Sequence, residues 1–436
     1  MRTRLEKVTI LTMDAHDTIY HDANITFDEH GILAINSPLD ADVVIDGQHG
    51  LVMPGFINTH AHFAMIPFRS LQDDRPDRLR KFLLPLEQAA MNEKLAVAAC
   101  RVAIAESLLA GVTTALDMYY FADAIANTFA QMGMRGVIAE TIMREATCDA
   151  SAPHGAMAML PDFIAKWKDH PLITPAIGPH GTTTVDLDIL RQCVELSNRY
   201  RLPLTMHVSE MDYEMDFFKN EYGQTPIAYL NTHGLLTEHL ILGHAIHATS
   251  EDITHIAKAK TKVAHCIGSN TKAAKGVAPV AEMLKHGVEV GLGTDGPSSG
   301  NTLDLFIQMN LAAKFHKTTL KDRSAFPAKT LVRLATRGGA EVLGLSDRIG
   351  SLEVGKAADL ILIETRSVNM FPIHDPYSVL VYSANPSNVD SVWVNGKNLV
   401  FHKQLVDHDV TLLIDQLRSA MREFSAQAER ISQTLD

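Results

Sequence analysis

Cysteine is scarce in this chain, which has four among its 436 residues: Cys100, Cys148, Cys193 and Cys266. The four are far apart and form no C-x-x-C pair. Neither a disulfide framework nor a thiolate zinc site is therefore indicated. Such a chain suits a reducing compartment, and we predict that the protein is cytoplasmic.

Positive charge is also in short supply, because 39 Lys and Arg residues stand against 51 Asp and Glu residues, for a net charge of −12 at pH 7. An acidic protein has no general electrostatic attraction to phosphate backbones or to anionic lipids. We therefore expect neither nucleic acid nor a membrane surface as a partner, and we look for a small-molecule substrate instead.

Long apolar runs are missing as well. No uncharged segment reaches the roughly 20 residues that span a bilayer, and the richest stretch, Leu95–Leu109, is interrupted by Arg101 and Glu106. The charged segment Met1–Ile10 is unlike a signal peptide. What is present is a hydrophobic content of 46%, which predicts a globular protein with a sizeable core.

The central part of the chain, residues 53–350, alternates short apolar segments with helix-compatible stretches. Eight such strands over about 300 residues are typical of a (β/α)8 barrel. A doubly wound sheet is the rival fold, but it would need a glycine-rich phosphate-binding turn at Pro54–Asn58, which lacks one. The predicted strands are Leu51–Asn58, Val112–Leu116, Gly136–Ala139, Ile173–Ile177, Leu204–His207, Leu240–Leu242, Lys262–Ala264 and Val288–Leu292.

The two ends of the chain are rich in β-like segments. We predict that residues 1–52 form a small antiparallel sheet and close with residues 351–436 into one small β-sandwich beside the barrel. Thr411–Ile431 is predicted to be a polar surface helix. The β-like segments are Lys7–Leu11, Ala23–Phe27, Ala41–Ile45, Leu352–Gly355, Ala358–Ile363 and Ser391–Val394.

His60-Ala61-His62 follows the first predicted strand of the barrel. Alternate residues of a strand point to the same side, so both imidazoles face the C-terminal mouth, where barrel enzymes have their active sites. Two neutral imidazoles at that separation suit one metal ion. The motif alone, however, arises by chance more often than as a metal site.

Polar side chains also follow three other predicted strands of the barrel. His207 ends the fifth strand, His244 follows the sixth and Asp295 follows the eighth. Such coincidence at four strand ends favours one shared metal site. Three nitrogens and one carboxylate suit Zn²⁺, or else Fe²⁺, and leave a position for water. The predicted ligands are His60, His62, His207 and Asp295.

Catalytic roles follow from charge and position. Glu210 lies three residues after a predicted ligand and is placed to move protons rather than to bind metal. His244 can hydrogen-bond the developing alkoxide, and Asp295 can accept a proton from the activated water. We interpret His247 as structural. The segment Ile173–His180 has no lysine to bridge two ions, so we expect a single divalent metal.

Two motifs make the chain resemble the amidohydrolase superfamily. Val52–His62 is similar to the first-strand motif of that family, and Leu352–Asp359 is similar to the segment that returns the chain to the β-sandwich. The branch that it resembles holds cytosine and guanine deaminases, S-adenosylhomocysteine/methylthioadenosine deaminases and s-triazine chlorohydrolases. The resemblance implies a metal-dependent hydrolase of C–N bonds in cyclic amidines, commonly a homo-oligomer.

The resemblance also implies a reaction. Metal-activated water attacks a C=N carbon of an aminated nitrogen heterocycle, the residue matching Glu210 protonates the ring nitrogen, and ammonia leaves. The residue matching His244 assists. Leu84–Glu87, Asp117–Tyr119 and Gly133–Arg135 are similar to the adenosine-derivative deaminases.

In those deaminases, the residue matching Glu87 contacts ribose hydroxyls and the one matching His180 lies at the substrate. We add Arg144 as a third candidate for substrate binding. Arg78 stands where an aromatic residue is usual, and Gly181–Thr184 replaces a frequent Ser-Pro-Tyr. These residues could also have purely structural roles. Glu87 would then be a carboxylate at the start of a helix, and Arg78 and Arg144 would be solvated surface charges.

Other functions stay open at this point. The same site could act on a pterin or a free base, or expel chloride or an amine from an s-triazine ring. A different class of function is a non-catalytic barrel that serves as an assembly scaffold. The scaffold hypothesis predicts that metal-binding residues are replaced by others, and all four predicted ligands are present here.

Overall fold

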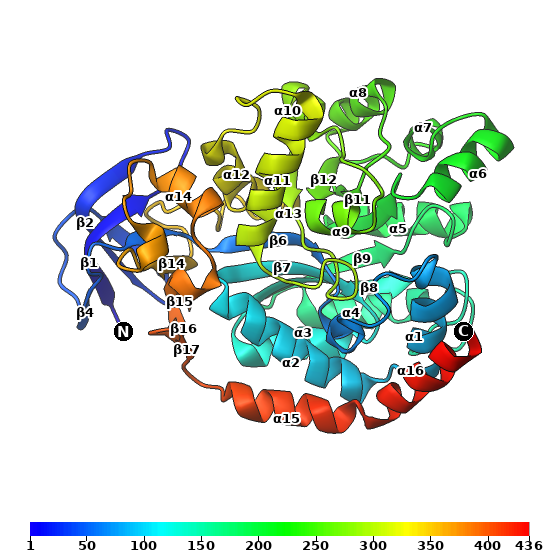
Figure 1. Ribbon diagram of the computed structural model, residues 1–436, viewed down its shortest axis with the longest axis horizontal. Helices are drawn as coiled ribbons and strands as arrows, with labels where there is room; N and C mark the ends of the chain where they lie inside the picture. The colour runs from blue at the N-terminus through cyan, green and yellow to red at the C-terminus, as the bar shows by residue number, and fades with distance from the viewer. Residues whose placement is uncertain (436) are drawn as a thin grey trace.

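The computed structural model describes residues 1–435, in which two sheets organise the chain (Figure 1). One is a parallel barrel whose eight strands are neighbours in chain order, and the backbone N–H of Asp295 donates to the carbonyl of His60 (3.0 Å) where the last strand meets the first. The barrel strands are β6 (Phe56–Ala61), β7 (Val112–Tyr119), β8 (Arg135–Ile142), β9 (Ile173–Pro179), β10 (Leu204–Val208), β11 (Leu240–His244), β12 (Lys262–His265) and β13 (Val290–Leu292).

The barrel strands form because their apolar runs are covered on both faces, and β7 and β8 are buried along their whole length. Helices surround them: α2 (Glu93–Leu109), α3 (Ala122–Met132), α4 (Leu160–Trp167), α5 (Leu187–Tyr200), α6 (Asp212–Tyr222), α7 (Pro226–Thr232), α8 (Ser250–Ala259), α9 (Ile267–Lys272), α10 (Val280–Lys285), α11 (Leu305–Leu320), α12 (Ala328–Leu334) and α13 (Arg337–Leu343). The predicted barrel is therefore confirmed.

Shorter helical segments complete the connections. They are the 3-10 helices η1 (Phe63–Phe68), η3 (Gly155–Ala158), η4 (Val368–Met370) and η5 (Pro386–Asn388), the π-helix η2 (Leu79–Leu83), and the α-helices α1 (Leu84–Ala90) and α14 (Pro376–Tyr382). The segment η1–η2–α1 follows the first barrel strand, so it lies near the mouth where the predicted ligands are found.

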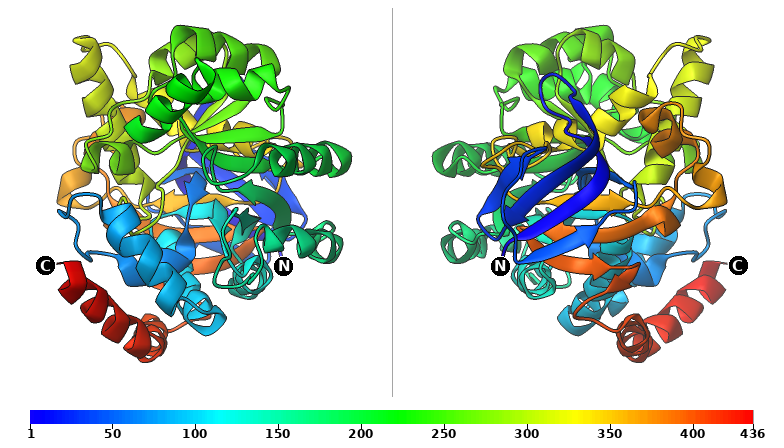
Figure 2. Two further views of the ribbon diagram at one scale, coloured as in Figure 1. Left: turned by 90° about the vertical axis from the view of Figure 1, so that its right-hand side faces the viewer. Right: turned by 90° about the vertical axis from the view of Figure 1, so that its left-hand side faces the viewer.

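Both ends of the chain contribute to the second sheet, as predicted, because β5 pairs antiparallel with β14. Figure 2 (right) shows the blue N-terminal strands beside the orange C-terminal ones. The rings of Phe27 and Trp393 lie 5.6 Å apart although their strands are not neighbours, so the sheet curls over its own core. Its strands are β1 (Thr3–Leu11), β2 (Ile19–Asp28), β3 (Gly31–Ile35), β4 (Val43–Asp46), β5 (Leu51–Pro54), β14 (Leu360–Ile363), β15 (Val389–Val394), β16 (Lys397–Phe401) and β17 (Gln404–Leu405).

Several details of this sheet differ from the prediction. The N-terminal part is not purely antiparallel, because β1 pairs in parallel with both β4 and β5. The segment Leu352–Gly355 is a loop and turn rather than a strand. The predicted strand Leu51–Asn58 is divided at Gly55, with one half in each sheet. The limits of the two domains at residues 52 and 350 stay a prediction.

A buried ion pair joins the second sheet to the barrel. Arg135 on β8 donates to both carboxylate oxygens of Asp359, at 2.7 and 3.0 Å, and both side chains are almost fully buried. Asp359 also accepts a hydrogen bond from the backbone N–H of Asn395 (2.7 Å). The segment that precedes β14 is thereby held against the barrel.

The C-terminal segment is two helices, α15 (Val410–Ala420) and α16 (Arg422–Leu435), rather than the one polar surface helix predicted. Their chain turns at Met421 and runs along the outside of the barrel (Figure 1). Phe424 is buried, with its ring 4.8 Å from that of Phe68. Within residues 1–435, no helix has the length and apolar character needed to cross a membrane.

Candidate active site and metal centre

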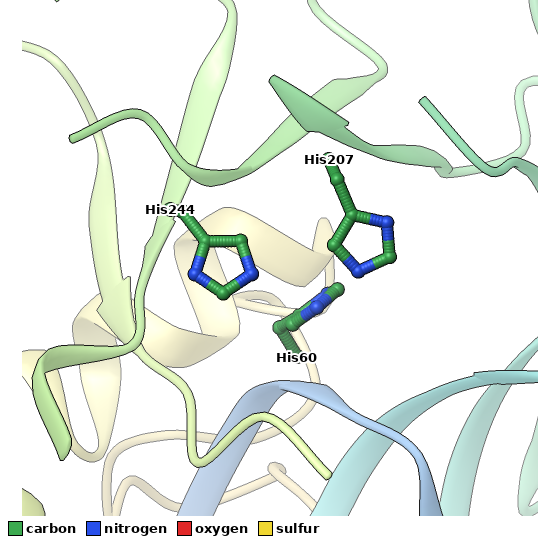
Figure 3. A group of neighbouring side chains, drawn as sticks. All are labelled: His60, His207 and His244. Atoms are coloured by element: carbon green, nitrogen blue, oxygen red, sulfur yellow. The ribbon is translucent and has the colours of Figure 1, made fainter. Parts of the chain in front are cut away.

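Four imidazoles converge at the C-terminal mouth of the barrel. His60 lies on β6, His62 directly follows it, His207 lies on β10 and His244 ends β11. The ring centroid of His60 is 4.8 Å from those of His62 and His207 and 5.4 Å from that of His244. Figure 3 shows three of these rings around a common centre. The strand-end positions predicted from the sequence are thus brought together.

Asp295 reaches this cluster from the chain that follows β13. Its Oδ1 lies 3.2 Å from His62 Nε2 and 4.0 Å from His60 Nε2, and its Oδ2 lies 3.9 Å from His244 Nε2. Ligand atoms of His60, His62 and Asp295 lie within 4.8 Å of one another, as do those of His60, His207 and His244. The predicted ligands therefore lie in two overlapping groups that share His60, and His244 belongs to one of them.

The cluster fits a divalent cation on two grounds. Within residues 1–435, both ring nitrogens of His60 and the Nε2 of His244 are buried and have no hydrogen-bond partner. Buried polar atoms are rarely left so, unless an ion or a ligand satisfies them. The donor set of imidazole nitrogens and one carboxylate also matches the ligands that Zn²⁺ and Fe²⁺ take in proteins.

Outer hydrogen bonds orient the imidazoles. His62 Nδ1 donates to the carbonyl of Met118 (2.6 Å), and His207 Nδ1 donates to the carbonyl of His180 (2.7 Å). The Nε2 atoms of the two rings then face inward, 3.3 Å apart. Partners of this kind fix the tautomer of a metal-binding histidine. The Nε2 atoms are therefore the nitrogens that a cation would meet.

The charge states of the cluster suit metal binding. Burial lowers the pKa of His207 to about 3 and that of His60 well below its usual range, so both rings are neutral. Burial opposes the ionisation of Asp295, but the hydrogen bond from His62 holds the pKa of that carboxyl well below its usual range. The same contact outweighs burial at His62 and raises its pKa to about 9. A cation bound at Asp295 would replace this proton.

Glu210 faces the imidazole cluster from the chain that follows β10. Its Oε1 lies 3.7 Å from His244 Nε2 and 2.5 Å from Lys275 Nζ. Burial would raise the pKa of Glu210, but the charges of His244 and Lys275 outweigh it and lower that pKa to about 2. Glu210 is therefore an ionised carboxylate beside the cluster, as a proton carrier must be before it accepts a proton.

Sequence reasoning missed the residues that hold these groups from α9. Asn270 Oδ1 lies 2.8 Å from His244 Nδ1, and Ser269 Oγ donates to Asp295 Oδ2 (2.6 Å). Lys275 follows the same helix. The signal that could have found them is position, because this polar segment begins immediately after the seventh barrel strand.

His180 lies beside the cluster, and His247 lies apart from it. The ring of His180 is 4.9 Å from that of His207, and its Nδ1 is 2.8 Å from Thr184 Oγ1. Burial lowers the pKa of His180 to about 4, which leaves it neutral. His247 pairs instead with the exposed Asp212 (3.5 Å). A substrate contact for His180 and a structural role for His247 stay predictions.

Glu87 lies on α1 and is buried. Its two oxygens accept hydrogen bonds from Tyr119 Oη (2.5 Å) and Tyr120 Oη (3.1 Å) at the mouth end of β7. Burial raises the pKa of Glu87, against these hydrogen bonds. A carboxyl held so firmly is more than a helix-start charge, although its contact with a substrate stays a prediction.

The two arginines singled out in the sequence differ. Arg144 is exposed, pairs with Asp186 at 2.7 Å and lines a cavity of about 470 Å³ to which α5 and α6 also contribute. The structure does not bring it to the imidazoles, and substrate binding by Arg144 stays a prediction. Arg78 is not a solvated charge, because its guanidinium donates to the carbonyl of Ser298 (2.5 Å) and pairs with Asp73 (3.1 Å).

Fold and site together define a class: a (β/α)8 barrel with a cluster of imidazoles and a carboxylate at the mouth of its strands that could hold a divalent cation. The model of the amidohydrolase family matches residues 51–399. A 5-methylthioadenosine/S-adenosylhomocysteine deaminase of Syntrophobacter fumaroxidans is 37% identical over 379 residues, 85% of each chain. A deaminase of the same name from Syntrophus aciditrophicus is 33% identical and covers 98% of this chain and 97% of its own. This chain belongs to the amidohydrolase family.

Solved structures are similar over nearly the whole chain. An adenosine deaminase from Xanthomonas campestris with bound zinc has a TM-score of 0.95 at 30% identity, covering 97% of this chain and 98% of its own. An atrazine chlorohydrolase from Arthrobacter aurescens in complex with zinc has a TM-score of 0.89 at 26% identity, covering 96% of this chain and 100% of its own. The family and the hydrolase class predicted from the sequence are thereby confirmed.

Proposed function

We propose that the protein is a hydrolytic deaminase of adenosine derivatives of the methylthioadenosine and S-adenosylhomocysteine type. The observation that carries the proposal is the ionised Glu210 beside the cluster of imidazoles and Asp295 at the barrel mouth. The curated relatives with this activity in their names cover most of the chain, which supports the choice of substrate class.

One divalent cation belongs to this proposal, with Zn²⁺ preferred and Fe²⁺ as the alternative. Its ligands would be His60, His62, His207 and Asp295, whose possible ligand atoms lie around His60, as does that of His244. A bound cation of this kind lowers the pKa of coordinated water and so provides a nucleophile near neutral pH.

The remaining chemistry belongs to side chains of this protein. Glu210 accepts a proton from the attacking water at its carboxylate and passes it to the ring nitrogen next to the reacting carbon. The new C–O bond forms at that carbon, the remaining proton of the added hydroxyl moves to the exocyclic nitrogen, and the C–N bond breaks so that ammonia leaves and a C=O group remains. His244, 3.7 Å from Glu210, is placed to hydrogen-bond the oxygen as it adds.

Substrate recognition would fall to the elements around the mouth. Glu87 can accept hydrogen bonds from ribose hydroxyls while Tyr119 and Tyr120 hold its orientation. His180 lies beside His207, on the side of β9. The η1–η2–α1 segment, which Arg78 ties to the carbonyl of Ser298, would form one side of the mouth around the bound molecule.

A second candidate is displacement of chloride or an amine from an s-triazine ring. The likeness to an atrazine chlorohydrolase favours it. Deamination of a pterin or a free base would use the same residues. A scaffold role has no support in the site, because none of the proposed ligands or proton-transfer groups is lost.

The setting of the enzyme is also part of the proposal. All four cysteines are free thiols, which supports a reducing, cytoplasmic location. We propose a homo-oligomer that binds a small heterocyclic substrate and no nucleic acid, and light scattering of the purified protein would test its oligomeric state.

Ammonia and chloride assays separate these functions. Zinc-loaded protein would be offered 5′-methylthioadenosine, adenosine, adenine, guanine, a pterin and atrazine. We expect ammonia from the adenosine derivatives, fastest with the thioether. Chloride release from atrazine without ammonia from any nucleoside would support the second candidate instead.

A further inference from the structure

Lys275 is a partly buried cation beside the proposed site. Only 16% of its side chain is exposed, and its Nζ lies 2.5 Å from Glu210 Oε1. Burial alone would lower the pKa of Lys275, but the carboxylates of Glu210 and Asp295 raise it, so the ammonium stays charged. Burying an ammonium is costly unless a partner of opposite charge meets it. Glu210 is that partner.

The turn that carries Lys275 belongs to a segment that holds three reactive groups at once. From α9, Ser269 bonds to Asp295 and Asn270 bonds to His244. The backbone N–H of Lys275 donates to the carbonyl of Asn270 (2.9 Å). The backbone position of Lys275 is therefore set by the same residue that orients His244.

Glu210 is held at a second point, through its main chain. Its backbone N–H donates to Glu214 Oε2 (2.9 Å) on α6. That contact fixes the backbone of Glu210 and leaves its side-chain torsions free. Within residues 1–435, the hydrogen bond from Lys275 is the one that restrains the carboxylate itself, and His244 Nε2 lies farther from it, at 3.7 Å.

We infer that Lys275 is a positioning residue, which binds Oε1 of Glu210 and so holds the carboxylate beside His244 at the imidazole cluster. The inference rests on the proposed proton-transfer role of Glu210. Proton transfer depends on near-contact geometry, and a misplacement of about 1 Å can cost about 100-fold in rate. A carboxylate free to turn toward water would lose that geometry.

Replacing Lys275 by Met tests the inference, since Met keeps a similar length without the charge. We expect Lys275→Met to lower kcat by about 10- to 100-fold with KM changed less than about 3-fold. Lys275→Arg, which can still donate to Glu210, should recover most of kcat. Metal content should match the parent protein in both variants. An unchanged kcat in Lys275→Met would overturn the inference.

Lys262 provides the matched control. It is equally buried, with 15% of its side chain exposed, and pairs with Glu289 where β12 begins, at the opposite end of the barrel from the site. Lys262→Met removes a buried ammonium without touching Glu210, so kcat should stay at the parent value. A loss of kcat equal to that in Lys275→Met would attribute the effect to general destabilisation and overturn the inference.

A double-mutant cycle, measured by thermal unfolding, tests this inference separately from the proposed function. Tm would be measured for the parent, Lys275→Met, Glu210→Gln and the double variant. If Lys275 acts on Glu210, the Tm shifts are coupled, and the double variant loses less than the sum of the single losses. Additive shifts would overturn the inference. Absence of turnover in the parent protein would refute the proposed function alone.

Discussion

Neighbouring side chains at the barrel mouth differ in charge because each meets a different set of partners. Burial keeps His207 and His180 neutral, while His244 and Lys275 keep Glu210 ionised. Titratable groups whose pKa values are pushed apart commonly mark a division of roles in an active site. Here we propose that this division separates metal binding from proton transfer.

Glu210→Gln tests the proton-transfer role. The amide cannot accept and return a proton, so kcat should fall by about 100- to 10,000-fold. Metal content should be unchanged, because the side chain is not among the proposed ligands. Ammonia release and elemental analysis of the same sample would measure both effects. Turnover near the parent value would refute the role.

The ionisation of Glu364 makes the stability of the fold depend on pH. This residue directly follows β14 of the second sheet, away from the proposed active site. Burial opposes its ionisation, but hydrogen bonds from Ser367 and Asn388 outweigh burial and lower its pKa to about 2. The ionised form therefore stabilises the fold above about pH 4.5, and this contribution disappears as the pH falls through 2.

We expect Glu364→Gln to lower the free energy of unfolding by about 2 kcal/mol at pH 7, and by progressively less as the pH falls from about 4.5. Urea unfolding at a series of pH values would measure this difference. Glu195→Gln, at an exposed position on α5, is the control. A constant difference between parent and Glu364→Gln across that range would contradict the assignment.

Residues that follow strands could be predicted from the sequence, while residues that reach the site from elsewhere could not. His62 and Asp295 were found because a barrel places every strand end at one mouth. Lys275 meets Glu210 across 65 positions of the chain, and no periodicity encodes that contact. Arg78 looks like a surface charge in the sequence, yet backbone carbonyls of the folded chain surround its guanidinium.

Among the elements, buried strands were the easiest to predict, since a strand covered on both faces is a continuous apolar run. For the same reason, the sequence does not indicate that the apolar run is divided at Gly55 into two strands that belong to different sheets. A Cβ at Gly55 would lie 2.1 Å from Thr113 Cγ2, so only glycine lets the chain pass there. The division of Leu51–Asn58 depends on that tertiary contact.

The C-terminal helices show a second limit. The segment from Thr411 is polar enough to be a surface helix, and most of its residues are exposed. Phe424 and Ala428 are nevertheless buried against the outside of the barrel. A few apolar side chains in a polar helix do not indicate which surface they cover.

The ion pair between Arg135 and Asp359 joins β8 to the segment before β14, so it tests how the two sheets support each other. Arg135→Met would leave a buried carboxylate unpaired, which should lower the free energy of unfolding by about 3–5 kcal/mol. Urea unfolding would measure the loss, with Arg199→Met at an exposed position as control.

Removing the partner charge as well should reverse much of that loss. The double variant Arg135→Met, Asp359→Leu removes both charges, and replacing a buried ion pair by apolar residues is often close to neutral. We expect its stability to lie nearer the parent than that of Arg135→Met. Equal stability of Arg135→Met and Arg199→Met would show that the pair does not join the sheets energetically.

For the molecule as a whole, the fold could be predicted and the substrate could not. Eight strands in a regular rhythm specify a barrel, and the two β-rich ends specify a sheet beside it. Substrate choice depends on side chains such as Glu87 and Tyr120, which meet through the tertiary arrangement of α1 and β7. Such contacts between separate elements leave no local pattern in the sequence.

The most direct test of the account is ammonia release from 5′-methylthioadenosine by the purified protein, measured with zinc bound, after removal of metal by a chelator and after zinc is restored. We predict one ammonia for each substrate consumed, loss of activity in the metal-free protein and its return with zinc. Failure of the zinc-loaded protein to release ammonia from any adenosine derivative would contradict the account.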